Sequence, residues 1–418
     1  MLVYSLTTIH PSGVGENEPE NIYYADNITQ AQLDVIEEFN KEYEGKYRVV
    51  PINLPFEKFS TNERKELLAR SFRSKSDRID VFAVDYIWVY RFAKWAEPLG
   101  KYFSTIQRKD IIDYAMESCY VEGDLMAMPQ KIDIGVMYYR KDILKEYPGY
   151  ELLESKLQNS ITWKEFLEVK EDFSNEENPF YIFPADNYEG LVCSYIESIL
   201  NLNRDFFAAD SLNFESEEAE KALRLLVEMV NKYNASPGKV TSFKEFTSHD
   251  YYIKNNGVFL RSWPTFIHDY NLYFKKENKK IEFGMAPLPK FEGTEPAAVF
   301  GGWNMMISKY SKNKTGAALF IEFMLREKVQ KEIFEKSGSL PVIKSIYNNA
   351  EYAAQYEALK FYKDLFSTGV YRPFLKDYTR ISDILSFYVN KAIKKEISVD
   401  EALSEANKLI HSDQVIIH

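Results

Sequence analysis

The chain has 418 residues, of which 45% are hydrophobic and 28% charged, and its formal net charge is −11. This length exceeds what one core of ordinary size holds and predicts two domains of roughly 150–200 residues each. Lysine and arginine are interspersed with aspartate and glutamate instead of forming a basic stripe, so the sequence argues against nucleic-acid binding.

Other features of the composition exclude further classes of protein. No apolar run approaches the roughly 20 residues that span a bilayer. Cys119 and Cys193 lie far apart without metal-ligand spacing, and we predict two buried reduced thiols. Five histidines without an H-E-x-x-H motif give a zinc hydrolase little support. We therefore expect neither a metal nor a redox cofactor.

The first part of the chain alternates between strand and helix patterns. The predicted elements are a short strand over Leu2–Leu6, a helix over Ile28–Tyr43 capped by Asn27 or Thr29, a strand over Tyr47–Leu54, a helix around Glu63–Arg73 and a strand over Ile79–Asp85. The last strand is nearly continuous in apolar residues, as buried parallel strands are. Because ligands of open α/β sheets lie at the carboxyl ends of such strands, Asp85 is expected to face a cleft.

The same alternation continues to the C-terminus. Two strands around Pro129–Leu144 precede a helix that Thr162 and Glu165 start as a capping box. A further strand leads into Phe283–Pro289. More helices are expected over Val192–Leu200, Ser216–Lys232, Gly316–Leu325, Lys328–Phe334 and Ile381–Ile410, the last with a break near Lys395–Asp400. The pattern predicts α/β lobes without a flexible linker between them.

Five segments of the chain form a recognisable series. They are Asp80-Val81 with Asp85 and Pro98-Leu99; Pro129 to Leu144; Trp263-Pro264 after Gly257; Ala286-Pro287-Leu288-Pro289 through Gly301-Gly302-Trp303 to Ile307-Ser308; and Gly338-Ser339-Leu340-Pro341 with Val399 to Leu403. In order and separation this series resembles family 1 of the extracellular solute-binding proteins, the receptors of carbohydrate ABC importers. The segments Arg261-Ser262-Trp263-Pro264 and Gly301-Gly302-Trp303-Asn304 are most similar to the trehalose/maltose-binding branch.

The resemblance implies a two-lobed α/β fold of the type II periplasmic-binding-protein class, with a ligand cleft between lobes joined by hinge segments. Lobe one would comprise residues 1–131 plus 287–326, and lobe two residues 132–286 plus 327–418. A monomeric receptor would close on a sugar or oligosaccharide and deliver it to the permease subunits of an ABC importer. The expected location is extracellular or periplasmic, with a lipoprotein anchor in the full-length protein whose signal segment is absent from this chain.

The resemblance also implies a set of site residues. Matched by position, the cleft residues are Asp85, Asp133, Trp263, Gly301, Gly302 and Trp303, and Tyr188 matches a stacking aromatic. The two acids are expected to accept sugar hydroxyls as charge-assisted hydrogen bonds. The indoles would stack on the apolar C–H face of a sugar ring, and the glycines would let the ring approach the backbone.

Each of these candidates has a structural alternative. Asp85 at a strand end is also suited to cap the following helix, and Asp133 to pair with a cation at the hinge. Trp263 and Trp303 also fit half-buried core positions. Arg261 is suited either to donate to hydroxyls or to orient a carboxylate.

Two segments depart from the family pattern. The polar stretch His10–Asn21 stands where relatives continue directly from the first strand, so the polar contact expected there falls to Glu16, Glu18 or Asp26. In the stretch Arg372–Ser386, where relatives often add an aromatic residue or an arginine to the cleft, the candidates are Tyr378 and Arg380.

Two other functions remain open from the sequence. The same fold serves as the ligand-sensing ectodomain of membrane signalling proteins. A carbohydrate-active hydrolase would use Asp85 and Asp133 as its paired acids, which must lie about 5–10 Å apart across the scissile bond.

Overall fold

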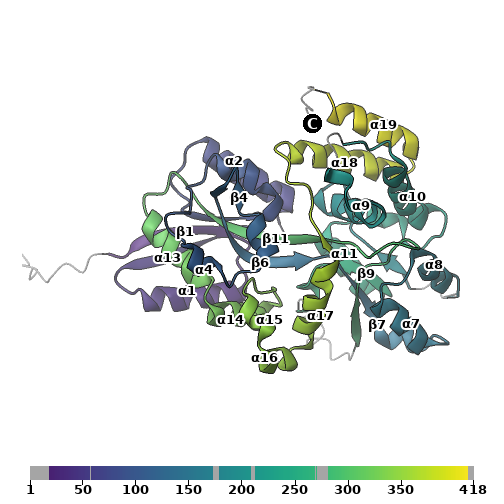
Figure 1. Ribbon diagram of the computed structural model, residues 1–418, viewed down its shortest axis with the longest axis horizontal. Coiled ribbons are helices and arrows are strands. Elements are labelled where there is room, and N and C mark those ends of the chain that lie inside the picture. Colours follow the sequence, from purple (N-terminus) through teal and green to yellow (C-terminus); the bar gives the residue numbers. More distant parts are fainter. Residues whose placement is uncertain are drawn as a thin grey trace, which may run out of the picture.

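The computed structural model describes residues 18–412 apart from residues 57, 173–177, 209–211, 269 and 271–280. The chain forms two α/β lobes, each built on its own sheet, which meet at the long strands β6 (Met128–Ile134) and β11 (Ala298–Ile307) (Figure 1). The predicted α/β class with two lobes is therefore confirmed. The strand predicted over Leu2–Leu6 lies outside the described residues.

The sheet of lobe one is mixed. Its strand order is β12-β11-β3-β1-β2, with β6 also paired to β11. Strand β1 runs parallel to β2 and β3, whereas β11 runs antiparallel to β3 and β6. The bounds are β1 (Glu20–Asp26), β2 (Tyr47–Asn53), β3 (Val81–Asp85) and β12 (Gly369–Val370), and a separate hairpin joins β4 (Tyr120–Val121) to β5 (Asp124–Leu125). The sequence did not predict β1, which lies between β2 and β3 in this sheet.

The sheet of lobe two has the order β10-β7-β9-β8, and β7 is antiparallel to both β10 and β9. Its strands are β7 (Val136–Arg140), β8 (Tyr181–Ile182), β9 (Phe259–Ser262) and β10 (Phe283–Ala286). Adjacent tyrosines Tyr138 and Tyr139 on β7 are fully buried, so they belong to the core of this lobe.

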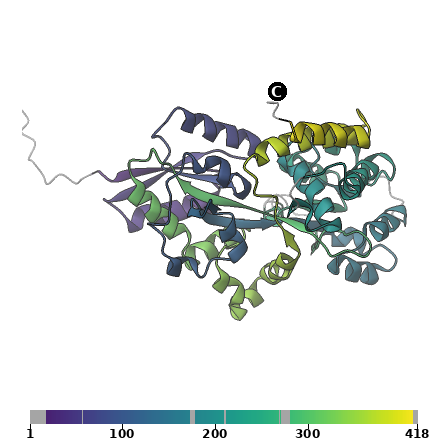
Figure 2. The same ribbon diagram turned by 45° about the horizontal axis from the view of Figure 1, so that its top comes forward.

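Helices cover both sheets (Figure 1). Those of lobe one and the region beside the hinge are α1 (Gln30–Glu42), α2 (Thr61–Arg73), η1 (Tyr86–Trp88), α3 (Val89–Ala93), α4 (Thr105–Arg108), α5 (Asp113–Glu117), α13 (Lys314–Met324), α14 (Glu327–Ser337), α15 (Lys344–Asn348), α16 (Ala350–Gln355), α17 (Glu357–Leu365) and η4 (Phe366–Thr368). Those of lobe two are α6 (Lys141–Leu144), α7 (Tyr150–Gln158), α8 (Trp163–Asp172), α9 (Glu189–Leu202), η2 (Phe206–Ala208), α10 (Glu217–Asn231), η3 (Gly238–Ser242), α11 (Glu245–Lys254), α18 (Tyr378–Ile393) and α19 (Val399–Ile410). The C-terminal pair α18 and α19 runs across the top of lobe two (Figure 2).

Local sequence signals explain where several helices start. The side chain of Thr29 accepts a hydrogen bond from the backbone N–H of Gln32, and the side chain of Gln32 accepts one from the backbone N–H of Thr29, so α1 begins with a capping box. Thr162 and Glu165 form the same arrangement before α8. Both predicted caps are confirmed. Val35, Ile36 and Phe39 on one face of α1 are buried, because apolar residues three and four positions apart share a helix face.

Three segments connect the lobes: β6 to β7, β10 to β11, and β12 to α18. The first passes through Gly135, where an added Cβ would lie 2.2 Å from Glu197 Oε1 of α9. Only glycine lets the chain pass so close to this carboxylate. The residue boundaries of the lobes stay a prediction, and the packing of α14 against α1 favours placing residues 327–337 with lobe one.

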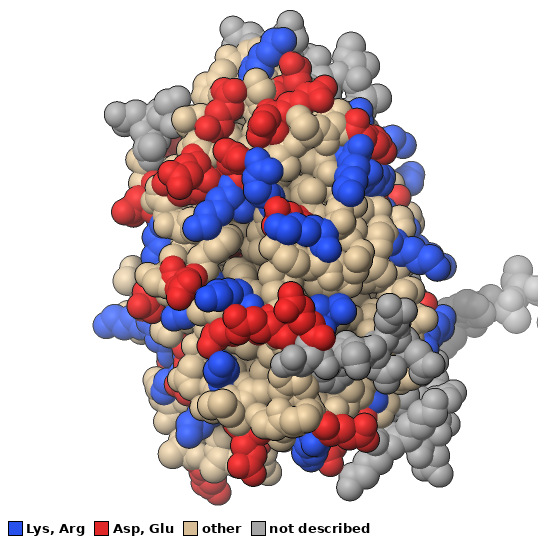
Figure 3. Space-filling view, turned by 90° about the vertical axis from the view of Figure 1, so that its right-hand side faces the viewer, with Lys and Arg blue, Asp and Glu red and all other residues tan. Residues whose placement is uncertain are grey.

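Surface charge is mixed on the outer end of lobe two. Acidic and basic side chains alternate over the described part of this face, and neither sign forms a continuous stripe (Figure 3). None of the described helices combines the length and apolarity that a membrane span requires. Both cysteines are buried and unpaired, as predicted.

Candidate functional site

Four positions share one face of the two central strands. Gly301 of β11 pairs with Asp133 of β6, and Trp303 pairs with Lys131. Directly opposed residues in an antiparallel pair project from the same face of the sheet. Trp263, just after β9, packs over this face, since a Cβ on Gly301 would lie 3.0 Å from Trp263 Cζ3. The structure therefore brings both predicted tryptophans, Gly301 and Asp133 to one surface where the lobes meet.

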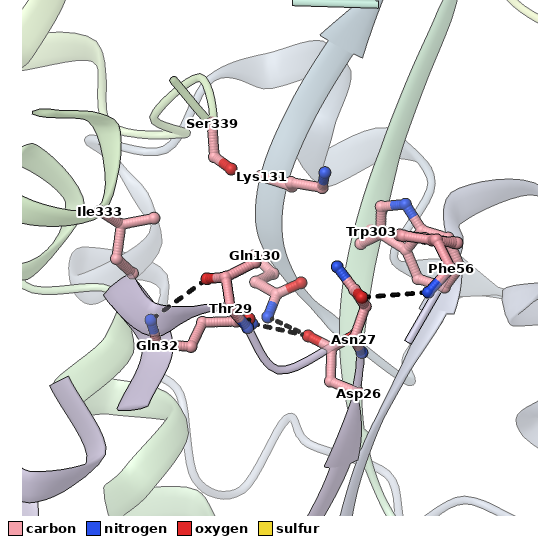
Figure 4. A pocket seen from close by; sticks show the side chains of 10 residues that line it. All are labelled: Asp26, Asn27, Thr29, Gln32, Phe56, Gln130, Lys131, Trp303, Ile333 and Ser339. Carbon is pink, nitrogen blue, oxygen red and sulfur yellow. Dashed lines mark hydrogen bonds between the residues drawn. The ribbon is translucent and has the colours of Figure 1, made fainter. Parts of the chain in front are cut away.

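A small cavity opens beside Trp303 in lobe one (Figure 4). It is lined by Asp26, Asn27, Thr29, Gln32, Phe56, Gln130, Lys131, Trp303, Ile333 and Ser339. Its volume is about 40 Å³, close to the roughly 30 Å³ that one water molecule occupies in the liquid. A sugar ring needs more space, so a ligand would enter this cavity only if the lobes or the lining side chains moved apart.

Trp303 is supported by a buried arginine. The guanidinium carbon of Arg64 lies 4.2 Å from the centre of the Trp303 ring and 4.4 Å from that of Phe56. Arg64 is 1% exposed and donates from Nη2 to Asp26 Oδ1 at 2.8 Å. Burial lowers the pKa of Arg64, although Asp26 opposes the shift. Its Nε and Nη1 have no hydrogen-bond partner among the described residues.

The carboxylate of Asp26 is fully engaged. It accepts five hydrogen bonds of 2.6–2.8 Å, from Tyr24 Oη, Asn27 N, Gln32 Nε2, Arg64 Nη2 and Gln130 Nε2. Two carboxylate oxygens offer about four lone-pair sites, so Asp26 has no capacity left for a ligand hydroxyl. Of the other candidates for this contact, Glu18 is exposed and Glu16 lies outside the described residues.

Trp263 is supported in the same way from lobe two. The guanidinium carbon of Arg261 lies 4.1 Å from the centre of the Trp263 ring. Arg261 is 1% exposed and forms two hydrogen bonds to Glu197, at 2.7 and 3.2 Å. Burial alone would lower the pKa of Arg261, but the adjacent Glu197 raises it. Of the two roles expected for Arg261, the structure shows the pairing with a carboxylate.

Asp85 joins the two lobes through an arginine. Its Oδ1 accepts from the backbone of Ile87 at 3.2 Å, which caps η1, and from Arg372 Nη2 at 2.7 Å. The other terminal nitrogen of Arg372 donates to Oε1 of Glu189 at the start of α9, also at 2.7 Å. Burial raises the pKa of Asp85, while Arg372 opposes the shift. Asp85 therefore caps a helix and, through Arg372, connects lobe one to lobe two.

Asp133 and Gly302 have different surroundings. Asp133 is 7% exposed and its Oδ2 lies 3.5 Å from Lys131 Nζ, which is the cation pair foreseen as its alternative role. Its Oδ1 has no partner among the described residues. At Gly302 the backbone φ is +140°, and an added Cβ would lie 2.5 Å from the carbonyl oxygen of Lys131. Glycine is required at this position because the backbone of β6 leaves no room for a Cβ atom.

The remaining predicted residues lie around this region or beyond it. Tyr188 precedes α9 and is 2% exposed, and burial raises its pKa. Tyr378 donates from its hydroxyl to Glu189 Oε1 at 2.6 Å. Arg380 donates to the carbonyl oxygens of Leu409, Ile410 and Ser412 at the end of α19. These contacts tie Arg380 to the last helix and do not support its predicted place in the cleft.

Sequence reasoning missed the charged residues that hold the tryptophans and the lobes. They are Arg64, Lys131, Glu189, Glu197 and Arg372. A signal existed for Arg64, which stands four and eight residues before the buried Leu68 and Phe72 and thus on the apolar face of α2. Arg372 has no such local signal, because its partners Glu189 and Asp85 are 183 and 287 residues away in the sequence. No cluster of metal-ligating side chains occurs among the described residues.

The chain is similar to known transport receptors. The model of a family described as "Bacterial extracellular solute-binding protein" matches residues 34–360. A protein of Deinococcus radiodurans described as a probable ABC transporter-binding protein is 27% identical over 350 residues, which cover 82% of each chain.

Solved structures share the whole fold. The maltose-bound MalE3 of T. maritima superposes with a TM-score of 0.81 at 25% identity and covers 93% of this chain and 98% of its own. The maltotriose-binding protein of Thermus thermophilus, bound to maltotriose, superposes with a TM-score of 0.74 at 20% identity and covers 93% and 98%.

Proposed function

Because this chain belongs to the bacterial extracellular solute-binding proteins, we propose that it captures a sugar or oligosaccharide between its lobes for an ABC importer. The observation that carries the proposal is the pair of tryptophans on one face of the central strands. Trp303 stands on β11 itself, and Trp263 packs over Gly301 two residues away. Two aromatic platforms with polar groups between them suit a saccharide, whose rings have apolar faces and hydroxyl edges.

The polar contacts proposed for the ligand follow from the free groups on this surface. Oδ1 of Asp133 is buried without a partner among the described residues, so it is the acceptor we assign to a sugar hydroxyl. Arg372 pairs with Asp85. We propose that this ion pair stabilises the closed position of the lobes and also contacts the ligand.

Transport also requires partners outside this chain. We propose that a monomer of this protein docks onto the permease subunits of the importer once the lobes have closed on the sugar. An extracellular or periplasmic location fits the family, and attachment through a lipid anchor is part of the proposal. These three proposals, on docking, location and anchoring, are supported by membership of the family.

A binding screen tests the proposal. The purified chain is titrated with maltose, trehalose, cellobiose and their longer oligomers while its melting temperature and heat of binding are measured. A ligand present at a hundred times its dissociation constant should stabilise the protein by about 2.7 kcal/mol. Trp263→Ala and Trp303→Ala should each abolish or strongly weaken this shift.

The matched control is Trp95→Ala, because Trp95 packs against Phe72 and Phe92 in lobe one rather than at the cleft face. It should retain sugar binding. A shift produced by amino acids or polyamines but by no sugar would contradict the proposal. Release of monosaccharide during these incubations would instead favour the hydrolase alternative.

A further inference from the structure

Exposed cations from four separate segments gather at one end of lobe one. The segments are the end of α2, the loop before β3, the end of α3 and the loop after β11, and their exposed cations are Arg70, Arg73, Lys75, Arg78, Lys94, Lys309 and Lys312. Phe72 of α2 packs on Trp95 after α3, and the backbone of Lys309 donates to the carbonyl oxygen of Trp95 at 2.9 Å. Lys312 pairs with Asp77 of the loop before β3 at 2.6 Å. These contacts bring the seven cations together, and we call them the basic patch.

The basic patch lies at the end of lobe one that is remote from lobe two. Helix α2 starts beside lobe two, where Lys65 Nζ lies 3.8 Å from Asp383 Oδ1 of α18, and it ends at Arg73 in the patch. Strand β1 starts at the same remote end, because it runs parallel to β3 with Tyr24 paired to Val81, the first residue of β3 (Figure 1). The chain therefore enters the described part of lobe one beside the basic patch.

Most cations of the basic patch have no acidic partner. Arg73 pairs with Glu66 at 3.5 Å and Lys312 with Asp77 at 2.6 Å. The other five cations of the patch form no ion pair within the part of the chain that the structure describes. The patch thus keeps a net positive charge, although the whole chain carries −11. A local charge of one sign attracts anions from a distance.

A hollow opens within the basic patch. Its volume is about 630 Å³, and it is lined by Ile52, Ser71, Ser74, Ser76, Asp77, Arg78 and Ile79. The acid on its wall, Asp77, is already paired with Lys312, whereas Arg78 has no ion pair among the described residues. The planar guanidinium of an arginine matches the geometry of phosphate oxygens. The hollow therefore offers room and an available cation for a phosphate group.

The composition of the basic patch fits a membrane surface better than a protein partner. Protein interfaces are depleted of lysine, whereas four to eight lysines and arginines next to a membrane bind acidic lipid headgroups. Each such cation contributes about 1 kcal/mol, which is about a fivefold gain in binding. The family to which the chain belongs is extracellular, so lipid headgroups are a more accessible polyanion there than nucleic acid.

We propose that the basic patch docks lobe one onto the anionic lipid headgroups of the membrane that holds the importer. This inference rests on the proposed function, in which a lipid anchor precedes β1 and so attaches at the same end of lobe one. A single acyl chain binds a membrane only marginally, and stable attachment takes a second signal such as a polybasic patch. The outer end of lobe two has mixed charge (Figure 3), so it lacks this attraction and lobe two moves when the lobes open and close.

Co-sedimentation with lipid vesicles tests the inference on the purified chain. Binding is measured at low salt to vesicles of phosphatidylcholine alone and to vesicles that also contain phosphatidylglycerol. The chain should bind the anionic vesicles at least about tenfold more tightly than the neutral ones. Added salt should remove this preference, because screening weakens interactions between exposed charges.

Two variants of equal charge locate the effect. The patch variant combines Arg70→Gln, Arg73→Gln, Lys75→Gln and Arg78→Gln, and its binding to anionic vesicles should fall about a hundredfold. The control variant combines Lys232→Gln, Lys239→Gln, Lys394→Gln and Lys395→Gln, which remove the same charge from exposed positions on lobe two, and it should keep the binding. If the patch variant does not fold, Lys94→Gln with Lys309→Gln tests the same patch and should weaken binding about tenfold.

Three results would overturn the inference and leave the sugar-receptor proposal standing. They are equal binding to neutral and anionic vesicles, anionic binding that the patch variant retains, and binding to a DNA duplex that is tighter than binding to anionic vesicles. A chain that binds anionic vesicles through the patch but binds no saccharide in calorimetric titrations would instead contradict the proposed function.

Discussion

Trp303 in lobe one and Trp263 in lobe two are each stacked by an arginine that pairs with a buried carboxylate, yet the two arginines are held differently. Arg261 binds Glu197 through two hydrogen bonds, and the pairing raises its pKa. Arg64 binds Asp26 through one hydrogen bond, and burial lowers its pKa.

The difference follows from what surrounds each carboxylate. Asp26 divides its two oxygens among five donors. Among the described residues, Glu197 accepts one hydrogen bond besides those of Arg261, from the backbone of Val299 at 3.2 Å. Both arginines keep donors without a partner among the described residues, Nη1 of Arg261 and Nε and Nη1 of Arg64. Lobe two nevertheless holds the arginine under Trp263 through two hydrogen bonds, and lobe one holds the arginine under Trp303 through one. The two similar aromatic platforms therefore differ in how firmly their arginines are held, Arg261 more firmly than Arg64.

The largest effect is expected from breaking the lobe-two support. Glu197→Gln keeps the shape of the side chain but removes the charge that neutralises Arg261, whose side chain is 1% exposed. Loss of one partner of a buried pair costs about 3–5 kcal/mol. The free energy of unfolding, measured by urea denaturation, should fall by this amount.

The control for this change is an exposed ion pair of the same lobe. Glu220→Gln removes the partner of Arg224, where both side chains are nearly half exposed, and should cost about 0–1 kcal/mol. A loss of stability as small in Glu197→Gln as in Glu220→Gln would mean that the Arg261 support is not tight, and the contrast with Arg64 would disappear.

The pH dependence of protein stability tests a contact next to Arg261 on the same strand. His249 Nε2 lies 2.7 Å from the hydroxyl of Ser262, which neighbours Arg261 on β9. Burial lowers the pKa of His249 to about 4, whereas an unfolded histidine titrates near ~6.5. Between these values the unfolded state binds a proton that the folded state does not, so stability falls as the pH falls through this window.

We expect the half-buried ring to contribute a loss of about 1–3 kcal/mol between pH 6.5 and pH 4. Urea denaturation at three pH values within the window measures it. His249→Gln should flatten the dependence, and His411→Gln at the exposed end of α19 should leave it in place. Stability that stays constant or rises on acidification would contradict the assigned direction of the shift.

The comparison also explains which features the sequence could reveal. Thr29 and Thr162 were predictable as helix caps because a cap depends on residues three positions apart. Trp263, Trp303 and Asp133 could be proposed as cleft residues because they stand in segments of recognisable pattern, and the structure brings them to one surface. By contrast, Arg372 meets Asp85 and Glu189 across sequence separations of 287 and 183 residues, which no local pattern encodes.

Other candidate residues are engaged by protein groups, because the same residue type can serve the ligand or the protein. Asp26 was a candidate for a ligand contact, but protein donors occupy its carboxylate. Arg380 was a candidate because an arginine was expected in this stretch, yet it caps α19 and Arg372 lies between the lobes. Composition and spacing can place a charged residue near a site, but hydrogen-bond capacity decides whether the ligand or the protein uses it.

The smallest expected effect comes from exchanging each tryptophan for phenylalanine. Both variants keep an aromatic face, so sugar affinity should fall only about tenfold, in line with the 0.5–1.5 kcal/mol typical of aromatic contacts. Trp303 is 7% exposed and stacked by Arg64, and tryptophan is the best partner for a cation. Trp303→Phe should therefore also lose about 1 kcal/mol of stability, whereas Trp263→Phe, at a half-buried position on an arginine held by two hydrogen bonds, should lose less. Calorimetric titration with the best saccharide and urea denaturation of both variants measure the two quantities, with Trp95→Phe as the control that keeps full affinity. Equal losses of stability at the two positions would show that the different pairing of the two arginines does not make the contact of Arg64 with Trp303 different from that of Arg261 with Trp263.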